Sequence, residues 1–399
     1  MKRLYQLCRD ELALCLLGAF IGLGAGCVDT LFGLVMNRLV EIRSAHLQIF
    51  LPLLGLAGAG MLYCYQRFGG PCRRGMALIF ETAQGKNPQV PFKLLPFAVG
   101  ATWITQLFGG SAGREGVAVQ IGGTIGSAAG RFVHTPQRKK TLLVAGMAAG
   151  FAGLFLTPMA AAFFALEVLS VGKIQHRSTL PVLTASWMAY FVSGRLGLVH
   201  HGYHLSGAVG ASWQTVGAVI LLGLAFGLLG RLFCMALHAA EHLGEKWIKN
   251  PLLRILIVGT GAGLLMLVLY QGRYAGLGGN LIDAAMSGKA LPWDFVLKIL
   301  FSVLCISVGF QGGEVMTLFA SGATLGCVLG PLLGLPAPFA AALGYVAVFG
   351  SGTNTLMAPI LIGCEVFGPE SLPWFLAVAW IAYSVNGNHA IYKLQEIAD

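Results

Sequence analysis

The sequence predicts an all-α integral membrane protein, and three observations support this prediction. Of its 399 residues, 56% are hydrophobic and only 11% are charged, whereas soluble domains carry about 25% charged residues. The mean hydropathy is +0.75, and the apolar residues lie in long runs. Alternation of period two is missing throughout the sequence, which argues against a transmembrane barrel. A water-soluble fold is therefore excluded, and the spans are expected to be helices, because a helix satisfies its own backbone hydrogen bonds in lipid.

Many of the apolar runs are long enough to cross a bilayer, which takes roughly 20 helical residues. The runs cover residues 11–37, 47–66, 141–171, 212–240, 252–270, 295–311 and 335–364. Their number and length predict about ten to fourteen spans, some of them tilted or broken.

The basic residues predict how the chain is oriented. Lys2, Arg3 and Arg9 precede the first apolar run, which places the N-terminus in the cytoplasm by the positive-inside rule. Short basic clusters also stand at the ends of spans: Arg73 and Arg74; Arg138, Lys139 and Lys140; Lys246, Lys249 and Arg254. A net charge of +10 distributed in this way indicates orientation and contact with membrane lipid, and not nucleic-acid binding. We expect a multi-pass protein of the inner (plasma) membrane.

Glycine is unusually frequent, with 56 residues. Two stripes repeat it every fourth residue: Gly122, Gly126 and Gly130 in the first half, and Gly322, Gly326, Gly330 and Gly334 in the second. Because small residues let helices approach closely in a membrane, the stripes predict tight helix packing with no further role.

The sequence gives no reason to expect a metal or a cofactor. The nine cysteines are scattered, mostly within apolar runs, and show no CxxC spacing. His200, His201 and His204 are close together, but a fourth metal ligand is missing from their neighbourhood, so an exposed loop is the preferred interpretation. An intramembrane enzyme would need a nucleophile with a positioned base, or a metal cluster, and neither pattern is present.

Two parts of the chain resemble each other at a nearly constant separation. The segment GGSAGREGVAVQIGGTIG contains Glu115, and the segment GFQGGEVMTLFASGATLG contains Glu314, 199 residues later. Glu167 and Glu365 each close an apolar run and are 198 residues apart. One duplicated unit explains both spacings. We place its boundary in the polar segment after residue 200, which gives a first repeat of residues 1–204 and a second of residues 205–399.

Glu115 and Glu314 stand among glycines and apolar residues, where a carboxylate costs several kcal/mol. One explanation is that each ends at the membrane interface or pairs with a basic residue such as Arg114. The explanation we prefer is that the glycines break a helix within the membrane and that a new helix begins at each glutamate. Helix N-termini carry partial positive charge and free N–H donors, so two opposed helix starts would form one anion site without needing a buried lysine or arginine.

A carboxylate at such a site can exchange a proton for an anion. Ionised, it is itself an anion and can occupy the site. Protonated, it is neutral and must leave. The pattern of residues therefore predicts a transporter of a small anion, with Glu115 and Glu314 as the candidates for gating and proton transfer.

Three motifs of the sequence resemble those of a known family. GREGVAVQIGGTIG is similar to the gating-glutamate motif of the CLC chloride channels and proton-coupled antiporters, with Glu115 at the gating glutamate. GGEVMTLFASGATLG resembles the second-half anion-binding segment, and IYKLQ resembles the terminal segment, with Tyr392 at the central tyrosine. The resemblance covers nearly the whole chain. It implies an inverted repeat of tilted and broken helices, and a homodimer with one pore in each subunit.

The resemblance also implies which residues form the ion path. Glu115 and Glu314 would carry protons. The anion would pass Met76, Gly113, Arg114, Gly116, Glu314, Val315 and Tyr392, in part through backbone N–H groups.

Departures from the chloride-selective members point to one branch of the family. The chloride-selective members have a GSGIP segment, whose serine coordinates the ion, where this chain reads RRGMALIFE with Met76 at that place. Methionine there, GREG, and Glu314 after paired glycines resemble the bacterial fluoride/proton antiporters. That branch has Thr-Pro where Met316 and Thr317 stand here, which is a departure at the inner gate. Without the resemblance, Met76 would be an ordinary packing residue.

The internal proton-transfer glutamate of the chloride/proton antiporters directly follows another glutamate. Here Glu167 is followed by Val168, so protons need another inner route, for which Glu314 is the candidate. We therefore predict a fluoride/proton antiporter. A chloride/proton antiporter or a passive anion channel of the same fold is the alternative, and an intramembrane enzyme or a structural membrane protein is the third class.

Overall fold

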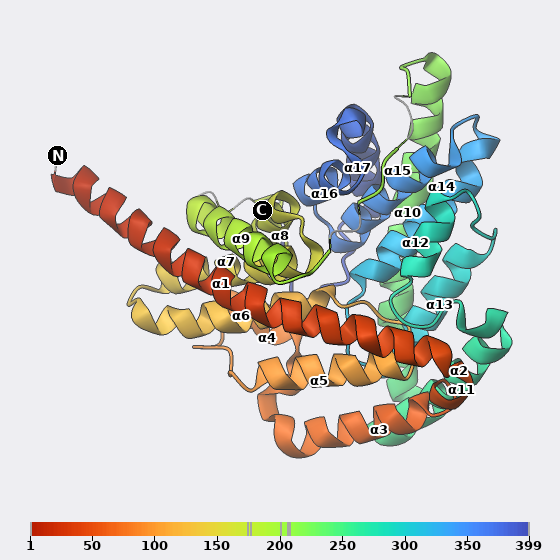
Figure 1. The fold of residues 1–399 in the computed structure, drawn as a ribbon, viewed down its shortest axis with the longest axis horizontal. Helices are drawn as coiled ribbons and strands as arrows, with labels where there is room; N and C mark the ends of the chain where they lie inside the picture. Colours follow the sequence, from red (N-terminus) through yellow and green to blue (C-terminus); the bar gives the residue numbers. More distant parts are fainter. Residues whose placement is uncertain (1, 174, 176–177, 200–201, 206–208, 398–399) are drawn as a thin grey trace.

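The computed structural model describes residues 2–173, 175, 178–199, 202–205 and 209–397. Helices make up nearly all of the regular structure in these residues, as the sequence predicts (Figure 1). The helices of the first half are α1 (Lys2–Ala45), α2 (Leu47–Phe50), α3 (Leu54–Cys64), α4 (Met76–Ala83), α5 (Leu94–Leu107), α6 (Glu115–Ala129), α7 (Pro136–Phe155), α8 (Pro158–Glu167) and α9 (Thr179–Arg195). Those of the second half are α10 (Trp213–Trp247), α11 (Pro251–Val268), α12 (Gly279–Met286), α13 (Asp294–Ser307), α14 (Val315–Leu332), α15 (Ala337–Thr353), α16 (Met357–Phe367) and α17 (Leu372–Asn386).

The helices differ widely in length. Among the described residues, 4 helices are long and apolar enough to cross a membrane by themselves: Arg9–Ala45, Trp213–Trp247, Pro251–Val268 and Val315–Leu332. Shorter apolar helices, such as α5 and α8, have fewer than 18 residues. The sequence predicted about ten to fourteen spans from the number and length of apolar runs. Several of these runs contain helix breaks, so one run does not correspond to one membrane crossing.

The glycine stripes pack helices together, as predicted. A methyl group added to Gly122 of α6 would lie 2.0 Å from the carbonyl oxygen of Gly146 in α7. In the second half, a methyl group on Gly322 of α14 would lie 2.1 Å from the carbonyl oxygen of Gly344 in α15. A side chain at any of these places would force the two helices apart. The same close pairing thus occurs once in each half.

The two halves are joined by a reciprocal pair of helix caps. Glu167, at the end of α8, accepts hydrogen bonds from the N–H groups of Met357 (3.0 Å) and Ala358 (3.3 Å), at the start of α16. Glu365, near the end of α16, accepts from Met159 and Ala160 at the start of α8, both at 2.9 Å. Because each helix end meets the other helix's start, α8 and α16 run antiparallel, as expected for an inverted repeat. The two glutamates whose spacing indicated the repeat are these caps.

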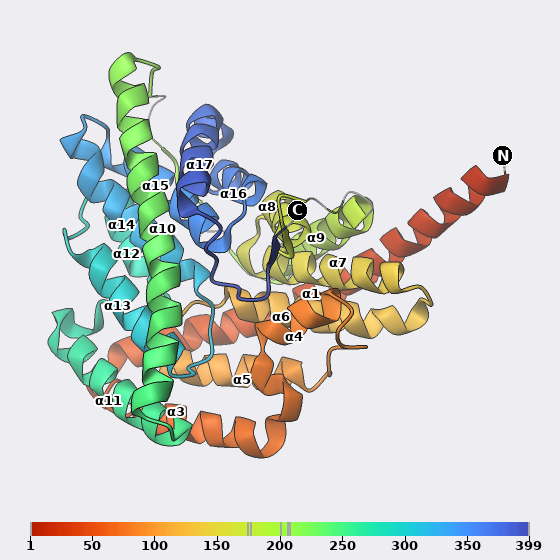
Figure 2. The same ribbon diagram turned by 180° about the vertical axis from the view of Figure 1, so that it is seen from behind.

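The C-terminal segment returns to the first half of the chain. Strand β2 (Glu396–Ile397) pairs in parallel with β1 (Ser170–Val171), which follows α8. Gln395 donates to the carbonyl oxygens of Val168 (3.0 Å) and Thr353 (3.1 Å). Figure 2 shows the blue C-terminal strand beside the yellow and green elements of the first half. These bonds fix the segment that carries Tyr392.

The polar clusters of the sequence fall at different places. His200 and His201 lie outside the described residues, and His204 is exposed. Of the basic clusters, Arg138 forms an ion pair with Asp10 near the start of α1, and Arg74 forms one with Glu81. The contact with Asp10 brings the second basic cluster beside the N-terminal part of the chain.

Candidate functional site

Both halves contain the helix break that the glycine clusters predict. Helix α5 ends at Leu107, a loop follows, and α6 begins at Glu115. In the second half, α13 ends at Ser307 and α14 begins at Val315. Each new helix starts inside the protein, because Glu115 and Val315 are both 1% exposed. Each start therefore presents its free N–H groups to the interior.

The two loops meet in a short antiparallel bridge. The N–H of Gly113 donates to the carbonyl oxygen of Gly313 at 2.5 Å, and the N–H of Gly313 donates to that of Gly113 at 3.0 Å. Gly116, in the first turn of α6, faces this bridge: a methyl group there would lie 3.6 Å from the Cα of Gly313. The bridge places the starts of α6 and α14 beside each other, although they are 200 residues apart.

The carboxylate of Glu115 occupies the space between the two helix starts. Its Oε2 accepts a hydrogen bond from the N–H of Arg114 at 3.0 Å, and the N–H groups of Glu115 and Met316 interact with the carboxylate electrostatically. A methyl group on Gly113 would lie 2.2 Å from Oε2, and one on Gly313 would lie 2.6 Å from it. The carboxylate thus lies against the backbone of both repeats, and the glycines leave room for it.

Arg114 flanks the carboxylate but does not hold it in an ion pair. Its guanidinium lies over the ring of Phe155, 5.7 Å from the ring centre, and it interacts with Glu115 electrostatically. The ion pairs found among the described residues do not include these two side chains. The explanation that Glu115 simply pairs with Arg114 is therefore not what the geometry shows.

Glu314 has a different place from Glu115. It is the residue before α14, it is part-exposed, and its side chain makes no capping bond to that helix within the described structure. It interacts electrostatically with Glu115 and with Glu241 of α10. The two bridging glycines are 200 residues apart, and so are the first residues of α6 and α14, whereas the two glutamates are 199 residues apart. Glu314 thus corresponds in the repeat to Arg114.

Two further predicted residues lie around the same region. Met76 is the first residue of α4 and is partly buried, and α4 packs against α6. Tyr392 is 9% exposed, and its ring lies 5.3 Å from that of Phe80 in α4. Tyr392 interacts electrostatically with both Glu314 and Glu115. The structure therefore gathers parts of α4, α6, α14 and the C-terminal segment.

A polar cavity of about 480 Å³ lies next to this region. The cavity is lined by side chains from α10, from the end of α13 and from the C-terminal segment, among them His238, Glu241, His242, Glu245, Gln311 and Lys393. Glu241 forms an ion pair with Lys393, the residue after Tyr392. Glu241, which lines the cavity, also interacts electrostatically with Glu314.

Lys298 is a buried residue near the site. It is not among the residues that the sequence motifs predicted to be functional. It is 0% exposed, and its ammonium donates to the hydroxyl of Ser111, in the loop before Glu115. The residue falls within the apolar run 295–311. A charged residue inside such a run is by itself a sign of function in a membrane protein, and that sign was available in the sequence.

The family model of the voltage-gated chloride channels matches residues 55–387. A "Chloride/fluoride channel protein" of Pseudomonas syringae pv. tomato is 35% identical over 392 residues, which are 96% of this chain and 86% of that protein. An "H(+)/Cl(-) exchange transporter ClcA" of Vibrio cholerae is 27% identical over 389 residues, covering 88% of this chain and 81% of that protein.

Solved structures show the same likeness. The crystal structure of a CLC-type fluoride/proton antiporter has a TM-score of 0.95 and 45% sequence identity, covering 97% of this chain and 98% of that one. The structure of a slow cyanobacterial Cl-/H+ antiporter has a TM-score of 0.80 at 21% identity, with 94% of each chain covered. The second likeness concerns the fold alone.

Proposed function

We propose that this chain, which belongs to the CLC family of voltage-gated chloride channels, is an integral membrane transporter that exchanges fluoride for protons. The observation that carries the proposal is the position of the Glu115 carboxylate on N–H donors of both helix starts. A group of N–H donors that stabilises a carboxylate can donate the same hydrogen bonds to another small anion. The likeness to a CLC-type fluoride/proton antiporter over 97% of the chain supports the choice of ions.

In the proposed exchange, Glu115 and the anion compete for one set of donors. The ionised carboxylate leaves the donors when it takes up a proton, because a neutral carboxyl gains less from the partial positive charge of the helix N-termini. Fluoride then takes the vacated donors. When Glu115 releases its proton on the other side, its carboxylate returns and displaces the anion. One residue thus moves a proton in one direction and admits fluoride in the other.

We assign the inner route to Glu314 and the polar cavity beside it. Glu314 is part-exposed and interacts with both Glu115 and Glu241. Glu167 has another role in this proposal, because its carboxylate caps the start of α16. The absence of a second glutamate after Glu167 in the sequence is consistent with a proton route that does not pass there.

The choice of fluoride over chloride rests on Met76 and on size. Fluoride is small and strongly hydrated, so a site can select it only by being narrow and by replacing the lost water with well-placed donors. Met76 stands where the chloride-selective members have a serine hydroxyl. The similarity to an H(+)/Cl(-) exchange transporter supports chloride/proton exchange as the second candidate.

Further parts of the proposal concern the setting. The N-terminus and the polar cavity would face the cytoplasm of a cell whose inner (plasma) membrane holds the protein. Two copies would form a homodimer with one pore each, embedded in lipid, and the two repeats would meet between residues 204 and 205. The protein would be a transporter without enzyme activity.

The deciding experiment uses purified protein in liposomes loaded with fluoride or with chloride. Ion-selective electrodes record anion release, and a pH electrode records proton uptake. We expect fluoride release to exceed chloride release by about tenfold or more, which corresponds to about 1.4 kcal/mol in the transport barrier. Fluoride release should drive protons in the opposite direction. Equal or faster chloride release would overturn the fluoride assignment, and anion release without proton movement would indicate a channel.

A further inference from the structure

Helix α13 carries two fully buried charged residues that stand one turn apart, Asp294 and Lys298, both 0% exposed. Residues at this spacing are neighbours on a helix, and an aspartate and a lysine there commonly pair. They do not pair here. The five ion pairs among the described residues include Asp294 but leave out Lys298.

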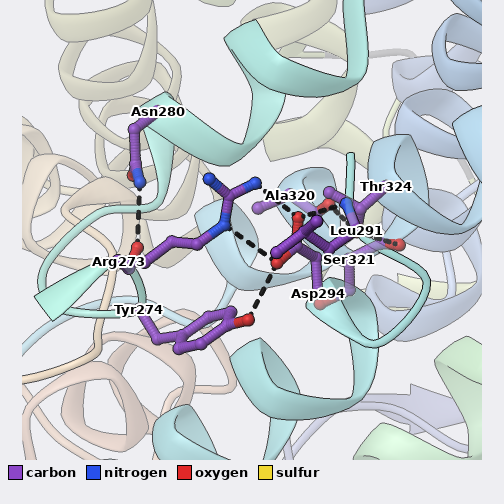
Figure 3. Close-up of polar contacts among 8 residues, drawn as sticks. All are labelled: Arg273, Tyr274, Asn280, Leu291, Asp294, Ala320, Ser321 and Thr324. Atoms are coloured by element: carbon purple, nitrogen blue, oxygen red, sulfur yellow. Dashed lines mark hydrogen bonds and ion pairs between the residues drawn. The ribbon is translucent and has the colours of Figure 1, made fainter. Parts of the chain in front are cut away.

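Asp294 is already satisfied by other groups, as Figure 3 shows. Its carboxylate accepts from Nε of Arg273 at 3.0 Å and from the other end of the same guanidinium at 2.6 Å. It also accepts from the hydroxyl of Tyr274 at 2.9 Å and from the N–H of Leu291 at 2.8 Å. Arg273 therefore balances the charge of this carboxylate, and Asp294 does not serve as the counter-charge of Lys298.

Lys298 reaches toward the loop that leads to Glu115. Its Nζ donates to the hydroxyl of Ser111 at 2.9 Å and to the carbonyl oxygen of Gly276 at 2.7 Å. The hydroxyl of Ser111 lies 2.9 Å from that of Ser302, which lies 2.8 Å from that of Thr317 in the first turn of α14. A chain of buried hydroxyls thus connects the ammonium to the start of α14, where the N–H of Met316 interacts electrostatically with the Glu115 carboxylate.

Neutral hydroxyls and carbonyls satisfy the donors of an ammonium but do not balance its charge. A buried cation without a counter-charge costs several kcal/mol. The carboxylate with which Lys298 interacts electrostatically is Glu115. Arg43, 6% exposed, adds to the imbalance, because it donates to the carbonyl oxygen of Gln106 (2.8 Å) and has no ion pair within the described structure.

We infer that Lys298 is the fixed counter-charge of the anion site. Its positive charge stabilises one negative charge in the site, whether that charge is the Glu115 carboxylate or the transported anion. An empty site with a neutral Glu115 leaves Lys298 uncompensated. Lys298 thereby enforces the exchange of one charge for the other and suppresses proton movement without anion movement. The inference rests on the proposed anion site, and Lys298 acts as a positioning and specificity residue, not as a proton carrier.

The first test compares fluoride affinity by calorimetry in purified unmodified protein, Lys298→Met and Lys298→Arg. We expect Lys298→Met to weaken fluoride binding by about tenfold or more, and Lys298→Arg to recover most of the loss because it keeps the charge. The matched control is Arg273→Gln, which removes a cation whose partner is the fixed carboxylate of Asp294. It should lower thermal stability and leave fluoride affinity within about twofold of the unmodified protein.

The second test measures coupling in liposomes. Lys298→Met should increase the number of protons moved per fluoride ion, because protonated Glu115 can leave the site without an anion replacing it. Unchanged fluoride affinity together with an unchanged proton-to-fluoride ratio in a folded Lys298→Met protein would overturn the inference and make Lys298 a structural clamp. If the unmodified protein releases chloride in place of fluoride, the proposed function fails, and the same comparison of variants is then made with chloride.

A third variant covers the case in which Lys298→Met does not fold. The double variant Glu115→Gln with Lys298→Met removes both opposite charges at once. Recovery of folding in the double variant, measured by size-exclusion elution and thermal unfolding, supports the pairing of Lys298 with the charge of the anion site. Failure of the double variant to fold, while Glu115→Gln alone folds, would contradict it.

Discussion

The starts of α6 and α14 share a frame but differ in chemistry. Each helix follows a glycine-rich loop, each loop supplies one glycine to the bridge, and each helix packs on its neighbour through glycines. At the start of α6, Glu115 folds its carboxylate onto the donors of both helices. At the start of α14, Val315 takes the matching place and Glu314 stands one residue earlier, part-exposed. A shift of one residue thus separates a carboxylate that lies between the two helix starts from one that interacts with Glu241 in the cavity lining.

This difference shows how an inverted repeat can serve an asymmetric task. The frame needs symmetry, because two opposed helix starts bind one anion better than one start does. Directional exchange needs two unlike carboxylates along the path. The frame and the carboxylates can therefore be tested separately.

The largest effect is expected at Glu115. Glu115→Gln keeps the size of the side chain but removes its negative charge and its ability to carry a proton. Fluoride-driven proton movement in liposomes should fall to the background of protein-free vesicles, whatever the rate of anion release. Normal proton coupling in this variant would remove Glu115 from the mechanism.

Glu314→Gln should slow exchange without abolishing the site. The carboxylate interacts with Glu115 and with Glu241, which lines the polar cavity, so its loss should reduce the turnover rate by about tenfold to a hundredfold, in the range of a lost proton-transfer group. Elution as a folded protein is the required control. Transport at the normal rate would favour a structural role, as would aggregation of the variant.

Met76→Ser tests selectivity independently of the two carboxylates. A hydroxyl in place of the thioether offers chloride a donor, so the ratio of fluoride to chloride release should fall by about tenfold, or about 1.4 kcal/mol in the difference between barriers. Leu78→Ser, two residues later on α4, is the matched control, because Leu78 is a buried core residue. It should cost stability and leave the ratio unchanged. An unaltered ratio in Met76→Ser would return Met76 to packing.

The smallest effects concern the frame. Glu167→Gln and Glu365→Gln each weaken a cap made of charged-acceptor hydrogen bonds, which should lower the free energy of unfolding by about 1 to 2 kcal/mol. Because the two caps are reciprocal, the losses should be similar, and proton coupling should persist in both variants. Thermal unfolding and liposome assays on the same preparations measure both quantities. A loss of coupling in Glu167→Gln alone would show that Glu167 also carries protons.

Much of the frame was predictable from residue types and spacing. The all-α membrane class follows from composition, and the repeat follows from the two glutamate spacings and the glycine stripes. The helix breaks follow from glycine clusters inside apolar runs, because free helix ends in a membrane need a special environment. The sequence predicts the second helix start at Glu314, and the structure has it one residue later, at Val315. The reciprocal caps of Glu167 and Glu365 were visible only as a spacing, since the sequence does not state which donors a carboxylate meets.

The finer features depend on contacts between distant segments. Glu115 and Glu314 look equivalent in the sequence, and only the glycine bridge shows that their registers differ by one residue. The predicted anion site needs no buried lysine, and Lys298 stands within an apolar run, so nothing local connects it with the site. Its partner Ser111 is 187 residues away, so its burial and direction follow from tertiary packing. The polar cavity is likewise lined by side chains of α10 and by Lys393, which are far apart in the sequence, so no local pattern predicts it.

The parts of the chain that gather around the anion site are made at widely separated times during synthesis. A ribosome produces Met76 and Glu115 early, Glu314 much later, and Tyr392 last of these. Until α14 has been inserted, the start of α6 has no opposed helix, and until β2 pairs with β1, Tyr392 has no fixed position. A half-made chain in the membrane thus contains an unfinished site and no complete route for anions. The complete site therefore requires segments from both halves of the chain and from its C-terminal end.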